Sequence, residues 1–166
     1  ANALGALPQG YISGVVAAGS CAAAGKRLCT PDEWLRACEG PAGTLYPYGD
    51  TYNPDACNEG RATHPVIDLF GSGATFDDAQ LNDPRLNQLP DSLAPSGAYT
   101  ACRSAEGVYD LHGNLHEWVA DAAGTFQGGF YVDATLNGPG CTYRTTAHSF
   151  EYHDYSTGFR CCDEGL

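Results

Sequence analysis

The chain has 166 residues and a mass of 17.5 kDa, which fits one domain and leaves little room for a second. Eight Lys and Arg against 20 Asp and Glu give a net charge of −12, so a nucleic-acid backbone or an anionic membrane surface would be repelled. There is no long apolar run, and the chain does not start with a basic segment followed by an apolar one. We therefore expect no membrane insertion, and a processed or trimmed first residue.

The cysteine content indicates the redox compartment. The chain carries eight Cys and no Met, and the even number is typical of a disulfide framework in the periplasm, at the cell surface or in the medium. A zinc–thiolate site is the alternative. The cysteines stand singly, apart from the adjacent pair Cys161 and Cys162, and no CxxC pair of the kind that brackets structural zinc occurs. The pattern favours disulfides.

Two helices are predicted near the start of the chain. The first is an Ala-rich run over residues 15–24. The second begins at Thr30-Pro31-Asp32-Glu33, which supplies an N-cap Thr, Pro at the first helical position and the Glu of a capping box. It runs to Gly40, and Trp34 and Cys38 share one of its faces. We expect Cys38 to point into the core with Trp34.

The rest of the chain shows turn signals and short strand-like runs. Between residues 49 and 105 no helical period is sustained, and Gly, Pro, Asn and Asp recur. Strand-like runs follow at 117–119, 129–132, 141–144 and 158–161. Helices followed by short strands predict an α+β fold with two helices, short antiparallel strands and long irregular loops.

The segment Gly-Val-Tyr-Asp-Leu-His-Gly-Asn-Leu-His-Glu-Trp, residues 107–118, is the most informative stretch. Asp110 and Glu117 flank a Gly-Asn turn. Calcium accepts carboxylate oxygens together with backbone carbonyls, so the spacing suits a calcium site. An ordinary turn with solvated acids is the alternative.

Several motifs, in order, resemble those of the formylglycine-generating enzyme (sulfatase-modifying factor) family, a divergent C-type-lectin-like fold. They are Gly-Lys-Arg-Leu and Thr-Pro-Asp-Glu-Trp (25–34), Tyr-Pro-Tyr-Gly (46–49), Ala-Cys-Asn (56–58), the 107–118 segment, Gly-Gly (128–129) and Gly-Phe-Arg-Cys (158–161). The resemblance spans about residues 9 to 162. It implies a single domain over 1–166 that lacks the family's N-terminal portion.

The resemblance also implies metal ligands. By analogy, calcium would be held by the Asp110 side chain, the carbonyls of Gly113 and Leu115, and the Glu117 carboxylate. A second calcium is expected at Asn58, with further ligands from the loop that follows it, where Asp77 and Asp78 are the candidates.

Two disulfides are implied in the same way, Cys21–Cys161 and Cys38–Cys141. Four cysteines then remain, and for them our hypothesis is the pairs Cys57–Cys102, which would bridge the irregular stretch, and Cys29–Cys162.

The clearest departure from the family concerns copper. Active members hold Cu(I) with two cysteines shortly after the Gly-Gly pair, and soft thiolates suit that ion. Residues 130–140 contain no Cys. Aligning Cys141 with one of these positions would leave it without a partner thiolate. We therefore expect the copper site, and with it the oxidase chemistry, to be missing.

Three histidines mark a possible ligand groove. His148 and His153 lie in an aromatic and acidic stretch of the family's substrate region, where they could join His116 and Arg144. Imidazoles with an acid can bind iron or copper, whereas hydrogen-bonded structural histidines are the alternative.

These observations predict a secreted, calcium-binding, non-catalytic domain that serves in binding or assembly. Its partner would be another protein chain or the N-terminal portion that the family carries. One alternative is a metal- and oxygen-dependent oxidase of the same superfamily. Another is a ligand-displaying module like the variable lectin-like proteins.

Overall fold

A computed structural model describes residues 4–163. The two predicted helices are confirmed as α1 (Gly14–Ala23) and α2 (Pro31–Glu39). The capping box at the start of α2 is formed: the Thr30 hydroxyl accepts the Glu33 N–H at 3.2 Å, and the Glu33 carboxylate accepts the Thr30 N–H at 2.9 Å. Within residues 4–163 no helix is both long and apolar enough to cross a membrane.

The strands form two small sheets. β1 (Arg27–Leu28) pairs with β6 (Cys161–Cys162). The larger sheet has the order β4-β3-β2-β5, formed by β4 (Arg144–Thr145), β3 (Phe126–Gln127), β2 (His116–Trp118) and β5 (Thr157–Phe159). The α+β class is confirmed, and the strands pair mostly antiparallel, as expected; among the described strands, only the pairing of β2 with β5 differs. β2 and β5 are parallel because the chain returns to the free side of β2 by a long connection.

Two of the strand-like runs fold differently. Gly128 and Gly129 have φ of +90° and +72°, and the Phe130 N–H reaches the Asp133 carbonyl at 2.8 Å, so 129–132 turns instead of extending. Residues Gly140–Thr142 form the 3₁₀ turn η3, and only β4 remains as a strand from the 141–144 run. The strand prediction rests on residue types, which do not reveal that two successive glycines adopt the left-handed conformation. The sequence therefore predicts a strand where the chain turns.

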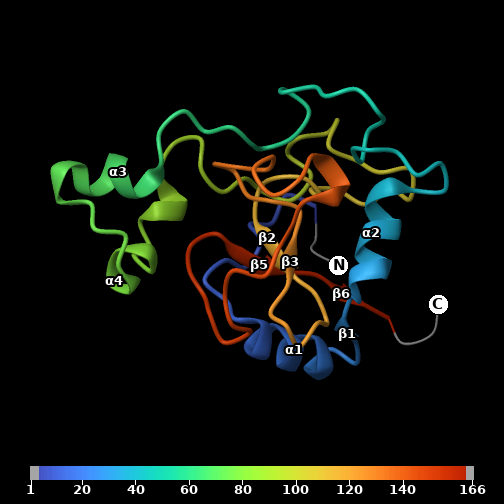
Figure 1. Cartoon of the computed structure of the whole chain (residues 1–166), viewed down its shortest axis with the longest axis horizontal. Helices are drawn as coiled ribbons and strands as arrows, with labels where there is room; N and C mark the ends of the chain where they lie inside the picture. Colours follow the sequence, from blue (N-terminus) through green and yellow to red (C-terminus); the bar gives the residue numbers. More distant parts are fainter. Residues whose placement is uncertain (1–3, 164–166) are drawn as a thin grey trace.

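The long stretch from 49 to 105 is largely irregular, as expected, but contains two short helices that were not predicted. α3 (Pro65–Phe70) and α4 (Asp78–Leu81) are joined by the 3₁₀ turn η1 (Gly71–Gly73) and followed by η2 (Leu86–Gln88). Helices of six and four residues are too short to show a period. They lie to one side of the molecule, away from α1 and α2 (Figure 1).

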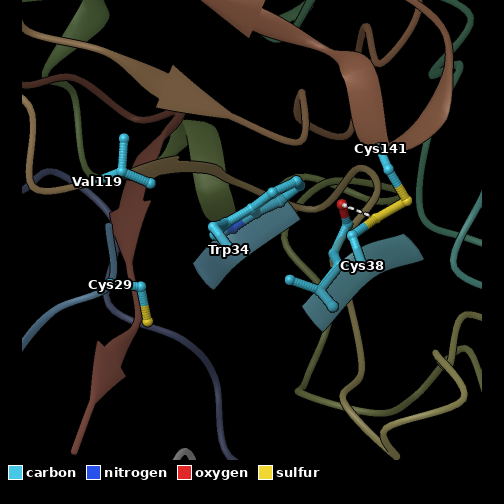
Figure 2. Close-up of a cluster of buried hydrophobic side chains, with 6 residues drawn as sticks. Cys29, Trp34, Cys38, Val119 and Cys141 are labelled. Carbon is cyan, nitrogen blue, oxygen red and sulfur yellow. Dashed lines mark hydrogen bonds between the residues drawn. A yellow bond between two sulfur atoms is a disulfide. The ribbon is translucent and has the colours of Figure 1, made fainter. Parts of the chain in front are cut away.

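The central core is built around Trp34. Its indole packs with Cys29, Leu111 and Val119 and with the Cys38–Cys141 disulfide (Figure 2). Trp34 and Cys38 are fully buried, which confirms the expected orientation of α2.

Four disulfides link segments that are distant in sequence. They join the pairs that the resemblance implies and the two that remain: Cys21–Cys161, Cys38–Cys141, Cys57–Cys102 and Cys29–Cys162. The separations run from 45 to 140 residues. Cross-links over long loops restrict the unfolded chain most, and each typically contributes roughly 2–4 kcal/mol.

The start of α3 depends on a neutral histidine. His64 Nδ1 accepts the Val66 N–H at 3.3 Å, so the ring proton is on Nε2, which lies 2.8 Å from the Tyr155 hydroxyl. Burial lowers the pKa of His64; nearby Asp154 opposes the shift, and Arg61 adds to it.

This cap predicts a pH dependence. Below the ordinary histidine pKa of about 6.5 the unfolded chain takes up a proton that the folded His64 resists, so stability is full above that pH and falls below it. His64→Asn keeps a capping acceptor but does not titrate. We expect the unfolding free energy, measured in urea, to fall more in the parent than in the variant between about pH 7.5 and about pH 5.5. Equal losses would contradict this role.

Candidate functional site

The turn from Asp110 to β2 brings the four implied calcium ligands into one segment. Asp110 has φ of +60°, and its carboxylate accepts the Gly97 N–H at 2.8 Å; burial raises its pKa. Gly113 has φ of +76°, and a Cβ there would lie 2.2 Å from the Asn58 carbonyl oxygen. Leu115 is buried beside β2. The glycine is required because the turn packs directly on the backbone at Asn58.

The Glu117 carboxylate is the polar centre of this segment. The Trp34 indole N–H donates to Oε2 at 2.6 Å. The Arg160 guanidinium grips both oxygens, donating from Nε to Oε2 and from Nη2 to Oε1. Both acceptor atoms are thus occupied by donors, and a positive charge already faces the carboxylate. As arranged here, these residues do not fit a calcium ion at Glu117.

Asn58, the ligand expected for the second calcium, makes hydrogen bonds within the protein. The Asn58 amide donates to the Ser92 carbonyl at 2.8 Å and to the Asn114 side chain at 2.9 Å. Asp77, an acid in the loop that follows, caps α4 through the Gln80 N–H instead. The structure does not bring these two residues together.

The predicted groove residues are only partly gathered. His116 is buried against Phe126, with 4.6 Å between ring centroids, and burial lowers its pKa to about 3. His148 is exposed and stacks 5.9 Å from Phe126 and 3.8 Å from Tyr152. Sequence reasoning had not singled out these two rings, although the aromatic stretch that holds Tyr152 was a signal.

The other two groove residues, Arg144 and His153, are not part of this stack. Arg144 pairs with Asp121 at 3.0 Å. His153 lines a surface hollow with Asp78, Asn82, Ser149, Glu151 and Tyr152. Within residues 4–163, no three His, Cys, Asp or Glu side chains lie together in a way that could hold a metal ion.

The structure also contains a buried polar pair, His112 and Glu59, that the sequence analysis does not predict. His112 Nε2 lies 3.0 Å from Glu59 Oε2, and both side chains are almost fully buried beneath Tyr46. Glu59 Oε1 and His112 Nδ1 have no hydrogen-bond partner in the described part of the chain. His112 lies inside the 107–118 motif, but nothing in the motif pairs it with Glu59, 53 residues away.

All eight cysteines are oxidised in disulfides. Cys141, the cysteine that could be aligned with one of the family's copper-binding positions, is bonded to Cys38 and fully buried. The residues present therefore do not fit a Cu(I) site built from two thiolates.

Residues 3–164 match the family described as the sulfatase-modifying factor enzyme 1-like domain. The chain belongs to this family. Two mammalian members are similar in sequence, and both are named inactive C-alpha-formylglycine-generating enzyme 2. The mouse protein is 28% identical over 93% of this chain and 48% of its own length, and the bovine protein is 31% identical over 69% and 33%. The chain thus spans half or less of these relatives.

Solved structures support the family fold. PvdO from Pseudomonas aeruginosa superposes with a TM-score of 0.63 at 16% identity, covering 92% of this chain and 60% of that one. CarF superposes with a TM-score of 0.51 at 22% identity, covering 82% and 46%. At these identities the likeness concerns the fold alone.

The Trp34 contact predicts a difference between the two tryptophans. Trp34→Phe removes a hydrogen bond to a carboxylate, and Trp118→Phe removes one to the neutral Ile12 carbonyl. Bonds to charged groups contribute roughly 1.5–3 kcal/mol and neutral ones roughly 0.5–1.5. We expect urea unfolding to show the larger loss for Trp34→Phe. Because both tryptophans are fully buried, the loss of ring volume is matched. An equal or smaller loss would contradict the Glu117 contact.

Proposed function

We propose that this chain is a non-catalytic domain of the formylglycine-generating enzyme type that works by binding a partner chain in an oxidising compartment. The single observation that carries the proposal is the pairing of all eight cysteines. Four disulfides also support secretion or a periplasmic location. Of the two expected calcium sites, only the one at Asn58 remains a prediction from the resemblance.

The chemistry behind this proposal is the loss of soft ligands. Oxidation by Cu(I) and oxygen requires thiolates that can hold the ion, and hard oxygen ligands replace them poorly. The turn after Gly129 presents Asp133 instead, whose carboxylate accepts the N–H groups of Thr135 and Leu136 at 3.0 and 2.9 Å. This segment therefore stabilises its own loop and offers no thiol to a metal.

The stacked rings supply a surface suited to binding. His148 is exposed and lies nearly parallel to Tyr152, with an interplanar angle of 11°. Phe130 is partly exposed next to buried His116. Flat aromatic groups contribute large contact areas at little entropic cost, and they are enriched at protein interfaces. The contacts of His148 and His116 are with aromatic rings, and they do not support the oxidase alternative.

A thiol count on the purified native protein tests the loss of catalysis. Unfolding in denaturant with a maleimide present should label no cysteine, and elemental mass spectrometry should find no stoichiometric copper or iron. Two labelled cysteines, or one equivalent of either metal, would favour the oxidase.

Photocrosslinking tests the partner role. A photoreactive residue in place of exposed Ser149, beside His148, should give crosslinks to a second chain in the native protein. The same residue in place of exposed Ser20, on α1, is the control. Crosslinks from the control position alone would place binding on another face.

A further inference from the structure

A side chain of the protein, Arg160, supplies a positive charge at the 110–117 segment. Arg160 follows β5 directly, and its planar guanidinium faces the Glu117 carboxylate in the two-pronged geometry that suits such a pair. The Nη2–Oε1 distance is 2.6 Å. The same Nη2 donates to the Tyr109 carbonyl at 3.1 Å. One guanidinium thus contacts both ends of the segment.

The burial of this pair makes the contact strong. The Arg160 side chain is 22% exposed and the Glu117 side chain 11%, so water screens their attraction only weakly. Asp110 accepts the Gly97 N–H instead of forming an ion pair with Arg160. The ion pair at this segment is therefore the one between Arg160 and Glu117.

A calcium ion would compete with this arrangement. It needs six to eight oxygen ligands, and Glu117 would have to turn its oxygens from the donors of Arg160 and Trp34. The ion would then lie against a guanidinium that cannot lose its proton. Two cations at one buried carboxylate repel each other, and the arginine is covalently held in place.

We infer that Arg160 takes the place of calcium at the Asp110–Glu117 segment, and that this chain keeps its fold without a metal ion there. The guanidinium joins β2, the end of β5 and, through the shared carboxylate, the indole of α2. This inference concerns the chain's own ion pair and goes beyond the proposed binding role.

The test compares melting temperatures in excess calcium and in chelator for the parent and for Glu117→Gln. We expect calcium to change the melting temperatures of both proteins by the same amount. Any calcium bound at Asn58 would contribute equally to both changes. Glu117→Gln should melt lower than the parent under both conditions, because it has lost Arg160 as a partner. Glu106→Gln, which loses the more exposed pair with Arg36, is the control and should melt close to the parent.

A calcium ion held by Glu117 would give a different pattern. At a hundredfold excess over its dissociation constant, calcium would raise the melting temperature of the parent by roughly 5–10 °C. That rise would vanish in Glu117→Gln, and this result would overturn the inference.

Terbium provides a second readout on the unmodified protein. A lanthanide bound at Glu117 would lie beside the Trp34 indole, and selective excitation of tryptophan would make it luminesce. We expect no tryptophan-sensitised emission that calcium displaces. Emission that calcium competes away and that Trp34→Phe abolishes would show a metal at this carboxylate and overturn the inference.

Discussion

The fold depends on disulfide cross-links between segments that short backbone pairings alone would hold only weakly. In the part of the chain that the structure describes, the longest helix has ten residues and no strand exceeds three, so the hydrogen-bond ladders are too short to fix the loops between them. Cysteines fill this role and also form much of the core. Cys29, Cys38 and Cys141 belong to the cluster around Trp34, and Cys57 and Cys102 to the one beside Tyr48. The disulfides are therefore part of the packed core as well as cross-links.

A polar contact complements the disulfides. Glu117 lies on the central strand and receives donors from α2 and from the segment after β5, so it joins the two halves of the chain through charge. Burying a carboxylate is favourable only when its acceptors are satisfied. Here Trp34 and Arg160 satisfy them, which explains why a chain of net charge −12 can place an acid in its interior.

Comparison with the family shows that the segments that build the fold are present, whereas the ligands for copper are not. The capped α2, the Gly-Asn turn before β2 and the Gly-Phe-Arg-Cys segment are the parts that position the core, and all are present. The soft metal ligands of the oxidase are not, since each cysteine serves a disulfide. The proposed binding role draws on surface rings: the stacked His148 and Tyr152, and Phe130 beside His116.

Several of these features can be predicted from short sequence patterns alone. Thr30 and Glu33 specify the start of α2 because their partners lie three residues apart, and the order of motifs indicates the family and its disulfides. Tertiary structure alone decided the parallel pairing of β2 with β5, the turn at Gly128 and Gly129, and the buried pair of Glu59 with His112. It also decided the partner of Glu117, because Arg160 is 43 residues away in the chain and only the folded core brings the two together. Contacts between distant charges follow from how the loops close, and no spacing in the sequence encodes that closure.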